Sequence, residues 1–263
     1  MPVTIRDVRA FKERGERFAM LTAYDYPTAR ILDEAGIPVL LVGDSVADNM
    51  LGYPTTVPVT MEEMLHHTRA VARGASNALI VGDLPFMSYQ ESLEEGIHNA
   101  GRMLKEGGAH AVKFEGAMTE LAHALVDRGI PVMGHLGLTP QSVHAMGGYR
   151  VQGKTDQDAQ RLAVEAESMA KAGAFAIVLE GIPTDVAKRI TESVEVPTIG
   201  IGAGPYCDGQ VLVITDLLGL SFRRPAKFVK PYTNLREEIT RAVAAFRDEV
   251  AAGTFPDEAH SYH

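Results

Sequence analysis

The segment PVLLVGDS, residues 38–45, is a run of Val and Leu that ends in glycine, aspartate and serine. Apolar runs without alternating polar residues are typical of strands that are covered on both faces, as in a parallel sheet. The segment ALIVGD, residues 78–83, repeats the pattern and again places an aspartate directly after a glycine. Both segments therefore predict a buried parallel strand that carries a carboxylate at its end.

Six further runs have the same β-rich, apolar character, which gives eight predicted strands. The eight runs cover residues 18–24, 38–44, 78–83, 110–116, 131–137, 175–181, 197–204 and 211–219. Segments with apolar residues at helical spacing lie between them, and one begins with the capping-box pair Thr60 and Glu63. No linker or low-complexity segment interrupts this order. The pattern predicts an α/β chain folded as one (β/α)8 TIM barrel over residues 1–263, with a doubly wound open sheet as the alternative.

Two helices are predicted outside the repeated units. A short helix at about residues 4–14 precedes the first strand and is expected to plug the bottom of the barrel. A long helix follows the last strand. Its apolar positions are Leu235, Ile239, Val243, Phe246 and Val250.

Composition narrows the class of protein. The 263 residues are 46% hydrophobic, and the net charge of −9 argues against a nucleic-acid-binding surface. A single cysteine, Cys207, excludes a disulfide framework and fits a reducing compartment. The first residues lack the apolar core of a signal peptide, and no segment reaches the ~20 apolar residues that span a bilayer. We expect a soluble cytoplasmic protein that acts on small molecules.

Three carboxylates fall at the ends of consecutive predicted strands: Asp44, Asp83 and Glu115. Active sites of such barrels lie at the carboxyl ends of the strands, and neighbouring strands are about 4.8 Å apart. Three acids so close together repel one another unless a cation joins them. A hard divalent ion with oxygen ligands, such as Mg²⁺, resolves the repulsion. The alternative for any single acid is a helix N-cap in the following turn.

Lys113 lies two residues before Glu115 and therefore faces the same side of its strand. It could neutralise a substrate oxyanion, form a Schiff base, or simply pair with Glu115 or Asp83. The nearby carboxylates favour a protonated lysine and hence charge stabilisation.

Glu180 ends the strand of AIVLEG, and we expect it across the barrel from the three acids. A lone carboxylate facing a site from an apolar strand should have a raised pKa, which suits proton abstraction from carbon. Its alternative role is an N-cap for the next helix. His135, at the end of the preceding strand, is either a supporting hydrogen-bond partner or a core histidine.

Six motifs together resemble one family, ketopantoate hydroxymethyltransferase, over nearly the whole chain. They are DLPF, KFEG, HLGLTPQSV, GGYRVQG, VLEG and IGIGAG, in this order. The resemblance implies a (β/α)8 barrel of the phosphoenolpyruvate/pyruvate-like type, a homodecamer, and dependence on Mg²⁺. The segment VADNM, residues 46–50, departs from the family's usual turn after GDS but removes no ligand.

The resemblance also implies roles for individual residues. Asp44, Asp83 and Glu115 match the family's direct or water-mediated metal ligands. Asp44, Ser45, Asp83 and Lys113 match the residues that hold the oxo acid. Glu180 matches the proton acceptor.

The implied reaction moves a one-carbon unit from 5,10-methylenetetrahydrofolate to 3-methyl-2-oxobutanoate through an enolate, giving ketopantoate. Three other functions stay open: a Mg²⁺-dependent lyase or mutase of the phosphoenolpyruvate/isocitrate-lyase type, a class I aldolase acting through Lys113, and a catalytically silent barrel that binds a phosphorylated metabolite. Lyases of that type usually rely on a lid cysteine, and Cys207 lies in a different segment.

Overall fold

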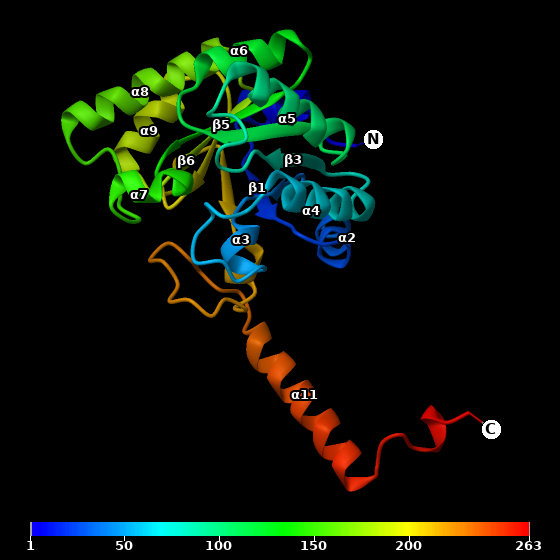
Figure 1. Cartoon of the computed structure of the whole chain (residues 1–263). Coiled ribbons are helices and arrows are strands. Elements are labelled where there is room, and N and C mark those ends of the chain that lie inside the picture. Colours follow the sequence, from blue (N-terminus) through cyan, green and yellow to red (C-terminus); the bar gives the residue numbers. More distant parts are fainter. Residues whose placement is uncertain (1, 263) are drawn as a thin grey trace. The chain divides into compact units, whose positions relative to one another are not determined.

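The structure is a computed structural model that describes residues 2–262. The chain divides into two compact units, the first ending at Val213 and the second starting at Ile214 (Figure 1). All eight strands belong to the first unit. The expected single domain over residues 1–263 therefore stays a prediction.

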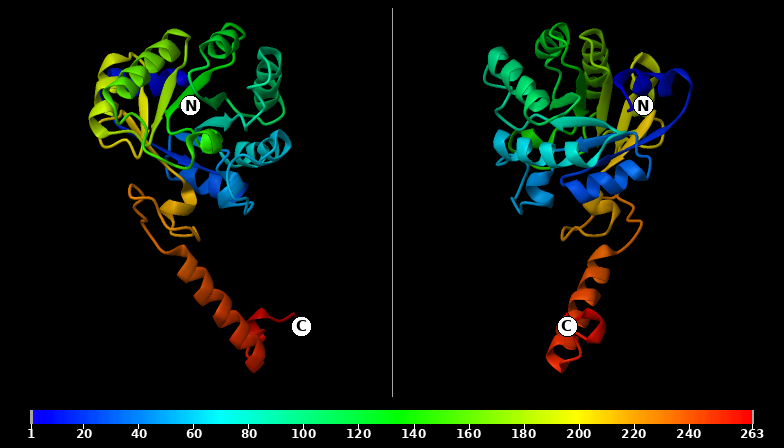
Figure 2. Two further views of the ribbon diagram at one scale, coloured as in Figure 1. Left: turned by 60° about the vertical axis from the view of Figure 1, so that its left-hand side comes forward. Right: turned by 90° about the vertical axis from the view of Figure 1, so that its right-hand side faces the viewer.

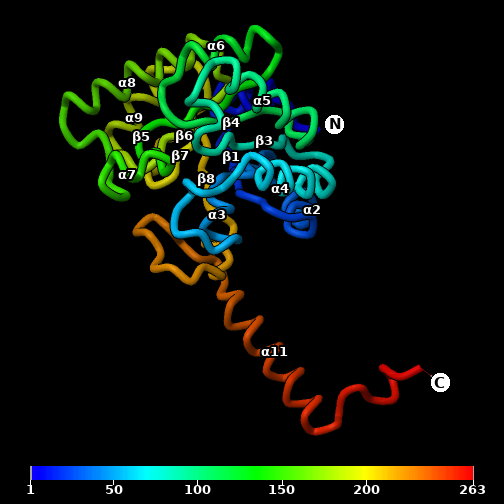
Figure 3. Tube along the Cα trace, in the orientation of Figure 1, coloured from blue at the N-terminus to red at the C-terminus, as the bar shows by residue number. Residues whose placement is uncertain are grey.

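Eight parallel strands in sequence order close into a barrel, with β8 pairing back to β1. Figure 3 traces this order through the first unit. The strands are β1 Phe18–Thr22, β2 Val39–Val42, β3 Leu79–Asp83, β4 Ala111–Glu115, β5 Val132–Gly137, β6 Ala176–Glu180, β7 Thr198–Ile201 and β8 Gly209–Leu212. The barrel prediction is confirmed, and the open-sheet alternative is wrong.

Helices surround the strands of this unit (Figure 2). They are α1 Ile5–Glu13, α2 Tyr26–Glu34, α3 Val46–Asn49, α4 Met61–Gly74, α5 Leu93–Lys105, α6 Thr119–Asp127, η1 Pro140–Ser142, α7 Val143–Met146, α8 Asp156–Lys171 and α9 Thr184–Ser193. The predicted capping box at the start of α4 is present, because Thr60 and Glu63 each accept from the other's backbone N–H. The departing segment 46–50 folds mostly as the short helix α3.

Helix α1 closes the amino-terminal end of the barrel, as predicted. Its Val8 is fully buried in one cluster with Phe18, Val39 and Val81 from the strands. Phe11 stacks on Phe18 with ring centroids 5.0 Å apart. Burying apolar side chains at this end excludes water from the barrel interior and leaves the opposite end for ligands.

The last predicted strand differs most from the structure. The expected strand over residues 211–219 is only Gly209–Leu212, and Ile214–Leu217 forms helix α10. Leu218 N–H donates to Ile214 O at 3.0 Å, which is helical pairing. A short apolar run does not distinguish strand from helix by itself, so the run was assigned to one element instead of two.

The second unit contains α10, the predicted long helix α11 Leu235–Ala252, and the short helix η2 Glu258–His260. Asn234 caps the start of α11, and Gly253, with φ of 67°, ends it. No helix within residues 2–262 has the length and apolar character needed to cross a membrane.

Candidate active site

Strand register brings the predicted site residues to one end of the barrel. Asp83 on β3 is paired with Lys113 on β4, and Glu115 is paired with His135 on β5. Glu180 ends β6 beside Gly137, the last residue of β5. Asp44 follows β2 after a single residue, Gly43. All of these positions lie at the carboxyl ends of the strands, where barrel active sites are found.

A buried ion pair lies at the centre of this group. Lys113 Nζ is 2.9 Å from Asp83 Oδ2, and the two side chains are 4% and 1% exposed. The backbone N–H of Asp44 donates to the same Asp83 oxygen at 3.2 Å. Asp44, Asp83 and Lys113 are therefore neighbours, as the sequence predicts.

His135 links this pair to the two glutamates. Its Nδ1 is 3.2 Å from Lys113 Nζ and 3.7 Å from Glu115 Oε1, and its Nε2 is 3.2 Å from Glu180 Oε2. Glu180 ends β6 and lies beside the same imidazole, although His135 Nε2 forms no hydrogen bond with it. The structure favours the supporting role for His135.

Two further residues of the site were not predicted from the sequence. The Gln141 side chain donates to Asp44 Oδ2 and to Leu84 O, both at 2.9 Å, and its Oε1 accepts from the Tyr89 hydroxyl at 2.7 Å. Its backbone N–H donates to Glu115 Oε2 at 3.0 Å. Gln141 could have been suspected from the sequence, because it is a polar residue within the motif HLGLTPQSV. No sequence pattern pointed to Tyr89.

Ser45 lies at the rim of the group. Its hydroxyl is 2.8 Å from the Tyr24 hydroxyl. The chain reaches this position past Gly43, where an added Cβ would lie 2.8 Å from Ser45 Oγ. Glycine therefore lets Ser45 turn back beside Asp44, which explains its place in GDS.

Helix capping does not account for the strand-end acids. The N-cap of α3 is Ser45, with no side-chain cap bond, and the helix after β3 is capped by Ser92. The N-cap of α9 is Pro183. Asp44, Asp83 and Glu180 are thus left for another role.

Burial shifts the pKa values of the carboxyl groups upward. Burial, and then the charge of Asp83, raises the pKa of Asp44 to about 7. Burial likewise raises the pKa of Asp83, and burial with the Asp44 charge raises that of Glu115 well above its usual range. Burial raises the pKa of Glu180 to about 7, as expected for a base that must hold a proton from carbon.

The basic groups respond to the same surroundings. Burial would lower the pKa of Lys113, but the charges of Asp83, Asp44 and Glu115 outweigh it and raise that pKa. Lys113 is therefore a fixed cation, which does not suit a Schiff-base lysine. Burial, with the Lys113 charge, lowers the pKa of His135 well below its usual range, so the imidazole is neutral.

The donor set fits a hard cation. Asp83 Oδ1 and Glu115 Oε1 are buried without a hydrogen-bond partner. Such orphaned oxygens are costly unless something positive binds them, and carboxylate oxygens are the ligands of Mg²⁺ and similar ions. Among residues 2–262 no three acidic, histidine or cysteine side chains are already arranged as a metal centre. The cation site therefore stays a prediction that depends on these oxygens.

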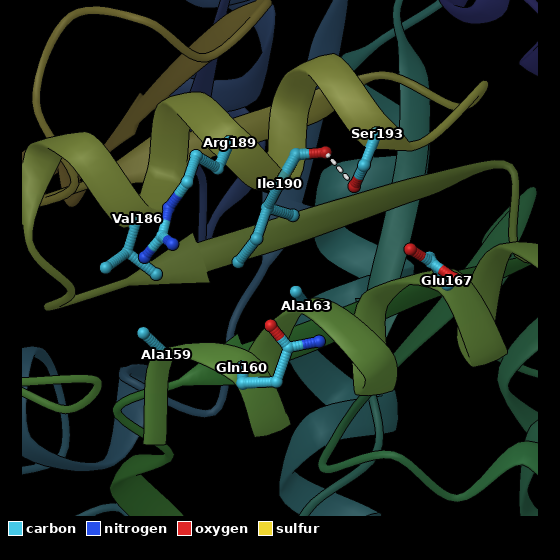
Figure 4. Close-up of a pocket in the computed structure, with 8 residues that line it drawn as sticks. All are labelled: Ala159, Gln160, Ala163, Glu167, Val186, Arg189, Ile190 and Ser193. Carbon is cyan, nitrogen blue, oxygen red and sulfur yellow. Dashed lines mark hydrogen bonds between the residues drawn. The ribbon is translucent and has the colours of Figure 1, made fainter. Parts of the chain in front are cut away.

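A separate hollow lies on the outside of the barrel between α8 and α9 (Figure 4). Its volume is about 210 Å³. The lining residues are Ala159, Gln160, Ala163, Glu167, Val186, Arg189, Ile190 and Ser193. None of the strand-end acids borders it, so it is not the candidate active site.

Fold and site together define a class: a (β/α)8 barrel with buried acids and a lysine at the carboxyl ends of its strands. A 2,3-dimethylmalate lyase of the PEP mutase/isocitrate lyase superfamily has the same fold, with a TM-score of 0.63 at 14% identity over 99% of this chain and 89% of that one. A phosphonopyruvate hydrolase in complex with oxalate and Mg²⁺ gives 0.60 at 15% identity, over 99% and 93%.

Sequence comparison gives the family. The family model of ketopantoate hydroxymethyltransferase matches residues 2–258. A 3-methyl-2-oxobutanoate hydroxymethyltransferase of Moorella thermoacetica is 56% identical over 99% of this chain and 97% of its own length. The chain belongs to the ketopantoate hydroxymethyltransferase family, a family of transferases. The resemblance stated from the six motifs is confirmed.

Proposed function

We propose that the chain transfers a hydroxymethyl unit from 5,10-methylenetetrahydrofolate to 3-methyl-2-oxobutanoate, giving 2-dehydropantoate in pantothenate biosynthesis. Family membership and relatives 56% identical over nearly the full length support this reaction. The observation that carries it is the buried Lys113–Asp83 pair among acids whose free oxygens have no partner. A divalent cation would balance the charges of these acids, and an anionic 2-oxo acid would bind beside the cation and Lys113.

Asp44, Asp83 and Glu115 are the residues proposed to hold Mg²⁺, directly or through water. When bound, such an ion would supply Lewis-acid chemistry that makes the C3–H bond of the oxo acid more acidic. Lys113 holds a positive charge beside the same substrate oxygens, and Ser45 offers a hydroxyl at the rim of the site. Charge held in place in this way stabilises an enolate without reorganisation.

Glu180 is the proposed base. Its carboxylate removes the C3 proton, and Nε2 of the neutral His135 ring lies 3.2 Å from it. The carbanion equivalent forms a C–C bond with the methylene carbon of the folate, whose C–N bonds break. One water supplies the hydroxyl group and one proton; this proton and the proton taken by Glu180 go to the two folate nitrogens, and tetrahydrofolate leaves.

The proposal also includes a homo-oligomer, which the resemblance to the family makes a decamer. It further includes a cytoplasmic location. Within the second unit, the apolar side chains of α11 support association between copies, because Val243 and Phe246 are exposed by 61% and 55%. Light scattering coupled to size-exclusion chromatography gives the subunit number.

A coupled assay tests the activity. The purified chain is incubated with 3-methyl-2-oxobutanoate and methylenetetrahydrofolate, with Mg²⁺ and with EDTA, and 2-dehydropantoate is measured. Mg²⁺-dependent product is expected. Folate-independent C–C bond cleavage would instead indicate a lyase, and borohydride trapping at Lys113 an aldolase.

A further inference from the structure

We propose that Gln141 is a positioning residue that fixes the carboxylates of Asp44 and Glu115 for cation binding, with its amide oriented by Tyr89. The inference rests on the proposed function for the identity of the ligand. It adds a residue pair to which the motifs gave no role.

Gln141 is 3% exposed and contacts two of the three strand-end acids. Its side-chain amide donates to Asp44 Oδ2, and its backbone N–H donates to Glu115 Oε2. One residue of the short helix η1 therefore sets the separation of carboxylates that come from β2 and β4. A shift of this residue moves both acids together.

Each of these bonds occupies one oxygen of a carboxylate and leaves the other. Glu115 Oε1, the oxygen that Gln141 does not hold, is buried without a partner. A carboxylate fixed by one oxygen presents the second in one direction, which is how supporting hydrogen bonds orient metal ligands.

The orientation of the amide is determined by its neighbours. Leu84 O and the Asp44 carboxylate can only accept, so the group facing them is the NH₂ of Gln141. The Tyr89 hydroxyl donates to Gln141 Oε1 at 2.7 Å, and Gln90 Nε2 donates to it at 3.1 Å. Rotating the amide by 180° would oppose donor to donor and acceptor to acceptor.

Tyr89 is itself tied to the site. Its hydroxyl oxygen accepts from the backbone N–H of Glu115 at 3.1 Å. Its single hydrogen has two acceptors within reach, and Gln141 Oε1 at 2.7 Å is much nearer than Glu115 O at 3.4 Å. The chain of bonds runs from Glu115 N–H through Tyr89 and Gln141 to the Asp44 carboxylate. The competing explanation is that Gln141 is a satisfied core amide that acts only on stability.

Metal affinity separates the two explanations. Mn²⁺ binding is titrated by electron paramagnetic resonance with saturating 3-methyl-2-oxobutanoate, for the wild-type chain, Gln141→Leu, Gln141→Glu, Tyr89→Phe and the double variant Tyr89→Phe/Gln141→Leu. We expect Gln141→Leu to weaken Mn²⁺ binding about 10–100-fold, as for other residues that orient metal ligands. Gln141→Glu keeps the shape and opposes an acceptor to Asp44, so it should weaken binding at least as much.

The double variant tests whether Tyr89 acts by orienting the Gln141 amide. Tyr89→Phe should weaken Mn²⁺ binding less than Gln141→Leu does, and the double variant should bind like Gln141→Leu, because Tyr89 acts through the amide. Gln160→Leu is the matched control: the same substitution on α8, outside the site. It should bind Mn²⁺ like the wild type.

Circular dichroism melting is measured for every variant. Folded Gln141→Leu and Gln141→Glu with wild-type Mn²⁺ affinity, or additive losses in the double variant, overturn the inference. If Gln141→Leu does not fold, the Mn²⁺ affinities of the nearly isosteric variants Gln141→Glu and Tyr89→Phe distinguish the positioning role from a role in stability alone. If the wild-type chain binds Mn²⁺ but makes no 2-dehydropantoate, the proposed function is wrong and the inference about Gln141 still stands. The Gln141 variants are compared by Mn²⁺ affinity and not by turnover.

Discussion

The two ends of the barrel bury acids in opposite ways. At the amino-terminal end, Asp33 is 6% exposed, and its carboxylate accepts from the backbone N–H groups of Ser76, Asn77 and Ala78 at 2.7–3.1 Å. At the carboxyl end, Asp83 and Glu115 are as deeply buried, but each keeps one oxygen without a partner.

The pKa values follow this difference. Burial acts to raise the pKa of Asp33, but the three backbone hydrogen bonds, together with one from the Asn77 side chain, more than offset it and lower that pKa. For Asp83 and Glu115 burial prevails, and their pKa values rise. A satisfied buried acid holds two segments together, whereas an unsatisfied one has a ligand still to bind. The same residue type therefore stabilises one end of the barrel and, as proposed, binds the ligand at the other.

The largest effect is expected from Glu180→Gln, which removes the proposed base and keeps the shape. Deuterium exchange at C3 of 3-methyl-2-oxobutanoate, followed by NMR, should slow about 10²–10⁴-fold, because general-base catalysis contributes that much. Binding of the oxo acid should persist. The matched control, Glu167→Gln on α8, should exchange at the wild-type rate. If Glu180→Gln keeps the wild-type exchange rate, another group removes the C3 proton.

Asp33→Asn should produce the next largest change, in stability instead of rate. The amide NH₂ would oppose a backbone N–H, so we expect the free energy of unfolding to fall by about 3 kcal/mol at neutral pH. Urea unfolding measures it. The C3 exchange rate should stay at the wild-type value, and a comparable loss of exchange would mean that the two ends of the barrel are not independent.

Much of this contrast could be predicted from the sequence, and part of it could not. The apolar runs and helical spacings predict the barrel, and Asp44 and Asp83 stand at the ends of such runs in the sequence itself. Their convergence follows from the order of neighbouring strands. The prediction for the last run was wrong in its bounds, because Val211 and Leu212 of β8 and Ile214 and Leu217 of α10 are all apolar and stand in one run.

Partners that are distant in the sequence were not predictable. Gln141 reaches Asp44 from 97 residues away, and Asp33 meets Ala78 from 45 residues away. No local sequence pattern predicts either contact, because a glutamine in a loop and an aspartate at a helix end are usually surface residues. Only the fold shows that one acid is satisfied and another is not.

Asp44→Asn should change stability in the opposite direction to Asp33→Asn. Neutralising an acid that is buried beside Asp83 relieves like-charge repulsion, so the metal-free chain should gain about 2 kcal/mol in free energy of unfolding near pH 8. Mn²⁺ affinity should fall in the same variant. Urea unfolding in EDTA checks the gain, and a destabilised Asp44→Asn chain would show that this end is held together by its charges.

The last predicted effect is a pH dependence that differs between the ends. Glu180 must be ionised to accept a proton, and its pKa is about 7, so the exchange rate should fall about tenfold for each pH unit below that value and level off above it. The pKa of Asp33 is lowered instead, so its stabilising effect is present above the unfolded-state value of about 3.9 and is lost only as pH falls through the folded value. Between about pH 5 and about pH 8 the exchange rate should therefore change while the stability difference between wild type and Asp33→Asn stays constant. Exchange rates and urea unfolding in the same buffers measure both. A flat exchange profile would remove Glu180 as the titrating base, and a stability difference that follows the exchange rate would show that one ionisation controls both ends.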